Sequence, residues 1–195
     1  MDIQSFTYIG LAFALLSSST MLVARNWRWL ISALGLQYLA VYILVSGPWP
    51  IELAAVKLVA GWMAASILGM TWINNPSQGS GQVVTGRIFR LSTALLVIIT
   101  ASSLAPQTAG FIPGIAIPHA WGGFLLIGMG LANLGFSTSG VRVILSLLTL
   151  LSGFEILYAA VETSTLVAGL LAVVTLGISL VGAYLLINFT EEPSI

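Results

Sequence analysis

Two ionisable side chains, Lys57 and Glu155, stand inside long apolar segments of the sequence. A charge surrounded by hydrocarbon is costly, so such residues are usually functional or paired. If the segments are helices rising ~1.5 Å per residue, Lys57 lies about 9 Å beyond Ile51, and Glu155 lies about 10 Å before Glu162. The matching depth and the opposite charges predict that the two side chains face each other or share a polar cavity.

Two interpretations of this pair are open. In the first, the pair or its separate polar groups only fix how helices pack. In the second, Glu155 is a protonatable stop on a proton path and Lys57 is its partner, so that the pair is switched by whatever separates the two groups. Gln37, near the middle of another apolar segment, is a candidate hydrogen-bonding link in that path, although buried amides more often hold helices together.

The sequence contains few residues that could support metal, redox or catalytic chemistry. The chain has no cysteine and one histidine, His119, which excludes disulfides, Cys-ligated iron–sulfur clusters, structural zinc and bis-histidine haem within the chain. A paired-aspartate site or a mid-depth Ser–His pair for catalysis inside a membrane is also missing. We therefore expect no catalytic residue, no metal site and no cofactor. His119 follows Pro118 at the outer end of the fifth apolar segment, where a histidine is typical of a solvated cap, although it could also take up protons near neutral pH.

The composition explains where these residues must be placed. Of 195 residues, 58% are hydrophobic and only 6% are charged, whereas soluble domains carry roughly 25% charged residues. This excludes a soluble enzyme, a disordered protein and a nucleic-acid binder, which would need a basic face. A membrane helix needs about 20 mostly apolar residues, and seven segments qualify: 6–23, 29–46, 51–73, 88–104, 120–136, 141–161 and 166–189.

The sequence thus predicts an all-α polytopic integral membrane protein with about seven transmembrane helices in a lipid bilayer. All seven prolines fall outside the seven segments, as expected if each segment is an unbroken helix in lipid. The segments are continuously apolar rather than alternating, which disfavours a β-barrel.

Charges at the segment ends predict the orientation. Arginines occur only at alternate junctions, and because cytoplasmic loops are enriched in Lys and Arg, we expect all of them on the cytoplasmic side: Arg25, Arg28, Arg87, Arg90 and Arg142. The opposite side then receives Asp2, Glu52 and Glu162. Seven spans place the N-terminus outside and the C-terminus, with Glu191 and Glu192, in the cytoplasm.

The first three and the last three segments share a layout. In each trio, an arginine-bearing junction is followed by a helix with a central polar residue, Gln37 within Gly35-Leu36-Gln37-Tyr38-Leu39 and Glu155 within Gly153-Phe154-Glu155-Ile156-Leu157. We interpret the chain as one membrane domain, 1–195, with two parallel trios at 1–76 and 119–195 and a spacer helix and loop at 83–118.

The final trio resembles the small three-helix membrane subunit of complex I-type NADH dehydrogenases, chain K in bacteria and chain 4L in mitochondria. The matching parts are Trp121-Gly122-Gly123-Phe124-Leu125-Leu126-Ile127-Gly128, then Arg142, then Gly153-Phe154-Glu155-Ile156. With its extra N-terminal helices and the lysine in Ala55-Val56-Lys57-Leu58-Val59, the whole chain looks more like component E of hydrogenase-4 and formate hydrogenlyase-type complexes. The corresponding small membrane component of multi-part cation/proton antiporters is a shorter relative of the same kind.

The resemblance implies a cofactor-free membrane subunit of a complex I-like or hydrogenase-like assembly that couples electron transfer to proton or cation translocation. Its partners would be antiporter-like and quinone-facing chains, in a bacterial or archaeal cytoplasmic membrane or an equivalent energy-converting membrane. In one respect the sequence departs from that family, whose small subunit usually carries a second acidic residue in its third helix. Residues 166–189 contain none, so Glu155 and Lys57 would have to work with groups on neighbouring subunits.

Two alternatives remain from the residues. A stand-alone small-solute or ion transporter would need a midplane binding cavity, typically beside a broken helix, and the mid-membrane polar residues are few. A purely structural subunit of a respiratory or photosynthetic complex would differ from the translocating subunit only in whether Glu155 titrates.

Overall fold

The structure, a computed structural model, describes residues 3–24, 26–74, 86–137 and 139–188. Seven helices occupy this part of the chain, and each is long and apolar enough to cross a membrane. The chain is therefore a polytopic membrane protein, as its composition predicts. The helices are α1 (Ile3–Val23), α2 (Trp27–Val45), α3 (Ile51–Asn74), α4 (Arg87–Phe111), α5 (Ile117–Phe136), α6 (Gly140–Val161) and α7 (Thr165–Asn188).

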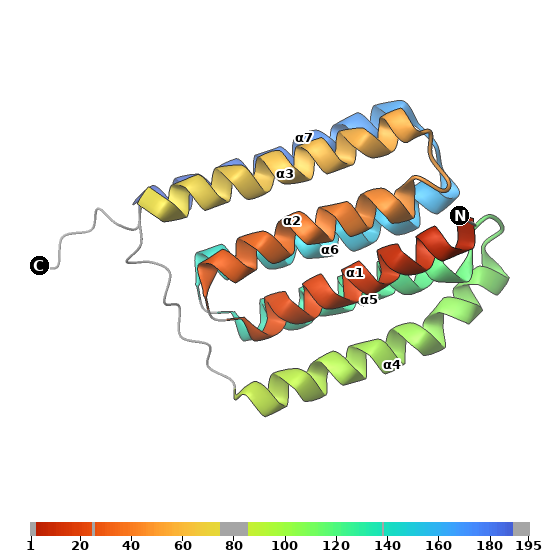
Figure 1. Ribbon diagram of the computed structural model, residues 1–195, viewed down its shortest axis with the longest axis horizontal. Coiled ribbons are helices and arrows are strands. Elements are labelled where there is room, and N and C mark those ends of the chain that lie inside the picture. Colours follow the sequence, from red (N-terminus) through yellow and green to blue (C-terminus); the bar gives the residue numbers. More distant parts are fainter. Residues whose placement is uncertain (1–2, 25, 75–85, 138, 189–195) are drawn as a thin grey trace, which may run out of the picture.

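The helices form two layers of three with one helix at the side (Figure 1). α1, α2 and α3 make one layer, and α5, α6 and α7 make the other. Each helix of the first layer contacts its counterpart in the second, α1 with α5, α2 with α6 and α3 with α7, and the two members of each pair run in the same direction. α4 packs on α5 and α1 at the edge. This confirms the two parallel trios and the spacer helix.

Glycines bring α5 and α6 together at backbone distance. A Cβ atom added to Gly153 of α6 would lie 2.6 Å from the carbonyl oxygen of Gly123, and one added to Gly130 of α5 would lie 2.8 Å from the backbone nitrogen of Leu150. Small residues of this kind allow close packing of membrane helices, where no hydrophobic force drives association. α6, which carries Glu155, is therefore held firmly against α5.

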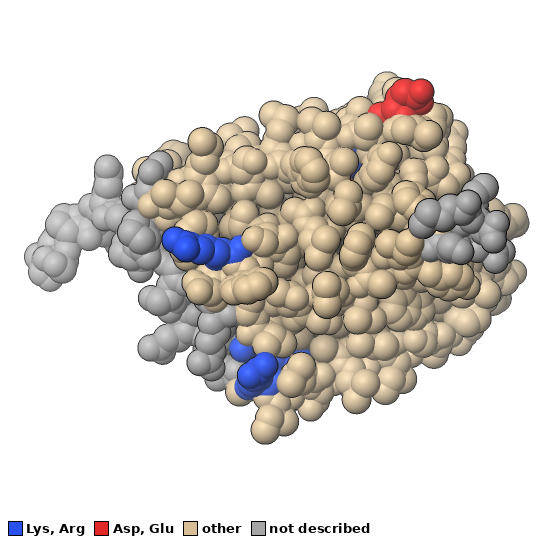
Figure 2. Space-filling view, viewed as in Figure 1, with Lys and Arg blue, Asp and Glu red and all other residues tan. Residues whose placement is uncertain are grey.

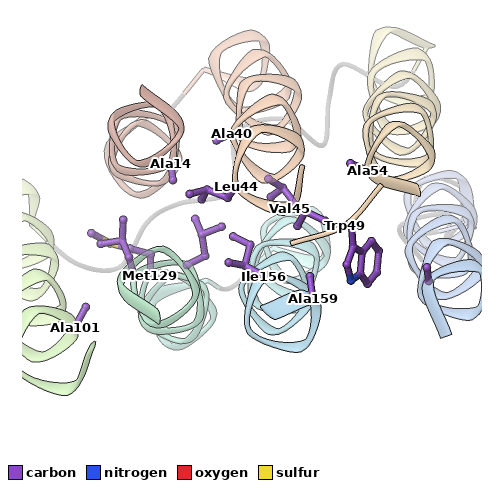
Figure 3. Close-up of a cluster of buried hydrophobic side chains, with 14 of the residues drawn as sticks. Ala14, Ala40, Leu44, Val45, Trp49, Ala54, Ala101, Met129, Ile156 and Ala159 are labelled. Carbon is purple, nitrogen blue, oxygen red and sulfur yellow. The ribbon is translucent and has the colours of Figure 1, made fainter. Parts of the chain in front are cut away.

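Apolar side chains fill the space between the two layers. In Figure 3, Leu44, Met129 and Ile156 point into the same space from α2, α5 and α6, and all three are buried. Near this cluster, the indole nitrogen of Trp49 donates a 2.8 Å hydrogen bond to the carbonyl oxygen of Glu162. This bond ties the α2–α3 connection to the α6–α7 connection at one end of the bundle.

The charges at the helix ends segregate to the two ends of the bundle. Blue side chains gather near one end of the face seen in Figure 2, and a red one lies near the other. We call the first the arginine end, with Arg28, Arg87, Arg90 and Arg142, and the second the acidic end, with Glu52 and Glu162. The remaining residues of the predicted charge pattern, Arg25, Asp2, Glu191 and Glu192, lie outside the described residues. Which end faces the cytoplasm stays a prediction.

The prediction that every proline lies outside the helices is wrong at two positions. α4 continues beyond residue 104 to Phe111 and contains Pro106, and α5 includes Pro118 in its first turn. A proline in a first turn removes a donor that has no partner there. Near Pro106, the side chain of Gln107 donates to the carbonyl oxygen of Ser103 at 3.1 Å, and such side-chain bonds help a membrane helix to pass a proline.

Candidate functional site

Lys57 and Glu155 form a buried ion pair inside the bundle. The Nζ atom of Lys57 lies 2.6 Å from Oε1 of Glu155, and each residue is only 1% exposed. Lys57 belongs to α3 in the first layer and Glu155 to α6 in the second, so the bond joins the two trios. The predicted meeting of the two charges is confirmed.

The helix bounds explain why the two groups meet. α3 begins at Ile51 and α6 ends at Val161, both at the acidic end of the bundle. Lys57 is six residues into α3 and Glu155 is six residues from the end of α6, so each lies about 9 Å inside that end. The bond between Trp49 and Glu162 holds the adjoining connections together and so fixes this register.

Two hydroxyl groups, those of Tyr38 and Thr175, lie near the Glu155 carboxyl, and the Ser152 hydroxyl lies beside that of Tyr38. The Tyr38 hydroxyl, from α2, lies beside those of Ser152 and Thr175 and near the carboxyl itself. Thr175, from α7, is also a neighbour of the carboxyl. All three residues are buried. We call these residues, with Lys57 and Glu155, the polar cluster; it draws on α2, α3, α6 and α7.

The sequence pattern does not assign Tyr38 or Thr175 to the site. A tyrosine next to Gln37 in an apolar segment gives no sign of where its hydroxyl points, and only the tertiary structure places that group near Glu155. A signal for Thr175 exists in the repeat: it follows Glu155 by twenty residues, as Lys57 follows Gln37 by twenty. The repeat therefore places a polar residue at the same register in α3 and α7.

Gln37 lies apart from the ion pair. Its nearest polar partner is Thr149 of α6, with 3.2 Å between the Thr149 hydroxyl and the amide oxygen. The same hydroxyl is 2.8 Å from the carbonyl oxygen of Leu145. The Thr149 hydroxyl has a single proton, and it donates that proton to the carbonyl oxygen of Leu145. It can then only accept from Gln37, so the side-chain amide of Gln37 turns its nitrogen toward Thr149. Gln37 joins α2 to α6, and no hydrogen bond links it to Lys57 or Glu155 among the described residues.

A row of buried polar residues on α6 connects the arginine end with the ion pair. Its members recur every three or four residues and so share one face of the helix: Arg142, Ser146, Thr149, Ser152 and Glu155. The hydroxyls donate to carbonyl oxygens of their own helix, for example Ser146 to Arg142 at 2.6 Å and Ser152 to Leu148 at 2.8 Å. Buried polar residues therefore occur along most of the length of α6, interspersed with buried apolar residues such as Leu145 and Leu148.

Two of the arginines are buried inside the bundle rather than exposed at its end. Arg90 of α4 donates from Nη1 to the carbonyl oxygen of Leu22, and Arg142 of α6 donates from Nη2 to that of Ala24 at 2.6 Å. They are 1% and 5% exposed. The last carbonyl groups of a helix have no partner within it and carry a partial negative charge. Both guanidinium groups thus cap the end of α1, a role that their place at a segment boundary did not indicate.

His119 is tied to a neighbouring helix rather than free in solvent. Its Nε2 atom lies 2.9 Å from the carbonyl oxygen of Leu44, so Nε2 carries a proton and donates it. The side chain is half-buried. The expected solvated cap is thus wrong in part, because the ring links the start of α5 to α2.

The polar cluster contains the groups needed for proton chemistry. Within the part of the chain that the structure describes, no group of three or more His, Cys, Asp or Glu residues is placed to hold a metal ion. A carboxyl and an amine in direct contact can exchange or trap a proton. Comparison of the chain with protein-family models, curated proteins and solved structures found no match.

Proposed function

We propose that the chain is a cofactor-free membrane subunit of a complex I-like or hydrogenase-like assembly, and that it contributes to proton or cation translocation coupled to electron transfer. Glu155 is the protonatable group and Lys57 its switchable partner. Antiporter-like and quinone-facing chains are the partners that the sequence resemblance suggests, which is an argument from analogy. In this proposal the arginine end faces the cytoplasm.

The observation that carries the proposal is the buried Lys57–Glu155 pair. A buried ion pair is often no more stabilising than packed apolar residues of similar size. Ionisable residues inside a membrane most often mark an ion or proton pathway. The attraction within the pair depends on both charges, so a charge brought near it by a neighbouring protein of the assembly can open it.

Gentle solubilisation followed by size and subunit analysis tests the first half of the proposal. We expect the chain to purify with larger antiporter-like membrane chains. A lone 20.5 kDa species that transports a solute or ion in liposomes would overturn the subunit proposal in favour of a stand-alone transporter.

Proton translocation by the reconstituted assembly tests the second half. Glu155→Gln keeps the shape of the side chain and removes its charge, and we expect it to lower the number of protons moved per turnover. Glu162→Gln is the matched control, because Glu162 is an exposed acid at the acidic end and should leave that number unchanged. Full assembly with unchanged translocation in Glu155→Gln would instead favour a structural subunit.

A further inference from the structure

Two complementary polar atoms of the polar cluster lack a well-formed hydrogen bond to any described residue. Oε2 of Glu155 and the Tyr38 hydroxyl are both buried, and neither makes a hydrogen bond of good geometry with a described residue, although the Ser152 and Thr175 hydroxyls are polar neighbours of Tyr38 and Thr175 is also one of Glu155. The carboxylate oxygen can only accept, whereas the phenol can donate. Buried polar groups are nearly always paired, so two unpaired groups of opposite kind in one cluster require an explanation.

The Tyr38 ring is fixed beside the ion pair by a glycine on α3. A Cβ atom added to Gly61 would lie 2.0 Å from Cγ of Tyr38, so the ring occupies the space that any other residue would fill. Gly61 follows Lys57 by four residues and therefore shares its face of α3. The ring thus packs one helical turn from Lys57, and its hydroxyl end lies near Ser152, Thr175 and Glu155.

Tyr38 is also the one hydroxyl of the polar cluster whose proton is uncommitted. The Ser152 hydroxyl donates to the carbonyl oxygen of Leu148 at 2.8 Å. The Thr175 hydroxyl donates to that of Leu171 at 2.9 Å. Each hydroxyl has one proton, so these two groups can accept hydrogen bonds, but only Tyr38 has a proton to offer Glu155.

We propose that Tyr38 is the second hydrogen-bond partner of Glu155, and that its hydroxyl donates to the carboxyl when Lys57 withdraws. The inference rests on the proposed function in one respect, because it requires the ion pair to open. A hydrogen bond to an ionised carboxylate is stronger than one between neutral groups, so Tyr38 would hold Glu155 in place while its usual partner is absent. Tyr38 is a positioning residue for Glu155, and the exchange between Lys57 and Tyr38 gives the site two states.

Removal of the hydroxyl in two backgrounds tests this role. In the otherwise unchanged chain, Tyr38→Phe should leave the unfolding equilibrium in detergent micelles nearly unaltered, because the hydroxyl makes no well-formed hydrogen bond with a described residue there. In the Lys57→Met background the same change should lower the folded-to-unfolded ratio by about tenfold or more, because Glu155 then loses its remaining donor. Tyr42→Phe, one turn along α2, is the control and should act alike in both backgrounds. An equal effect of Tyr38→Phe in both backgrounds would overturn the proposal.

A spectroscopic readout covers the case in which Lys57→Met does not fold. The carboxyl band of protonated Glu155 is identified in the full chain as the infrared signal that Glu155→Gln removes at low pH. Tyr38→Phe should move this band to higher frequency through loss of a hydrogen bond, and Tyr42→Phe should not. An unmoved band would overturn the role of Tyr38. Neither readout requires translocation, so the proposed function can fail in its own assay while the Tyr38–Glu155 contact is upheld.

Discussion

The bundle buries cations in two places, and their partners differ in kind. In the half nearer the acidic end, Lys57 is held by the carboxylate of Glu155. At the arginine end, Arg90 and Arg142 are held by backbone carbonyl oxygens at the end of α1. Both places remove a positive charge from water, but the first does so with a side chain and the second with the main chain.

The difference decides which place can change state. A backbone carbonyl has no ionisable proton, and a guanidinium stays charged at any pH that a protein tolerates, so neither group in these two hydrogen bonds can change its protonation state. A carboxylate can be protonated and a lysine amine deprotonated, which makes the Lys57–Glu155 pair the place where a proton or a neighbouring charge can act. Burial alone therefore does not indicate function; the chemistry of the partner does.

The largest expected effect comes from breaking the ion pair on one side. Lys57→Met leaves the Glu155 carboxylate without its counter-charge, and we expect a loss of about 3–5 kcal/mol in the free energy of unfolding at neutral pH. Protonation of Glu155 removes the stranded charge, so this loss should shrink as the pH falls. Unfolding in detergent micelles across a pH series measures both effects.

Glu155→Gln breaks the same ion pair by removing the other charge. It strands the Lys57 ammonium instead, and loss of a proton from that group relieves the charge, so the destabilisation should shrink as the pH rises. Identical pH dependence in the two variants would contradict an ion pair that forms from one titrating acid and one titrating base.

A smaller effect is expected at the arginine end. Arg142→Gln removes the charged hydrogen bond to the carbonyl oxygen of Ala24, and we expect a loss of about 1.5–3 kcal/mol that does not vary with pH, because neither group of that hydrogen bond titrates. Arg28→Gln is the matched control, since Arg28 is exposed at the same end and lies over the Trp27 ring at 5.6 Å. A clear pH dependence in Arg142→Gln would place this arginine among the switchable groups.

The smallest effect is expected for the link between α2 and α6. Gln37→Leu removes the contact with Thr149, and such bonds between membrane helices contribute about 0.6 kcal/mol on average. We expect the variant to keep the proton count of the reconstituted assembly. A fall as large as that in Glu155→Gln would instead place Gln37 on the proton path.

The sequence predicted the ion pair because depth in a membrane can be counted along a helix. Six residues after Ile51 and seven before Glu162 place Lys57 and Glu155 at one level, and opposite charges at one level inside a bilayer have few other partners. The same counting could not find Tyr38, because a tyrosine fits an apolar segment equally well whether its hydroxyl points inward or toward the headgroups. Nor could it show that Pro106 lies inside α4, since the sequence alone does not reveal whether nearby side chains bond to the backbone around it.

Composition and charge spacing by themselves determined a membrane protein of seven helices in two parallel trios, because hydrocarbon excludes unpaired backbone and most charges. The tertiary structure decided which polar groups meet. Lys57 and Glu155 are 98 residues apart in the chain, and they touch because the trios stack layer on layer, with α2 against α6 and α3 against α7. The rotation of each helix about its axis and the stacking of the layers decide where each side chain points. As a result Lys57 meets a carboxylate, whereas Arg90 and Arg142 meet backbone carbonyl oxygens.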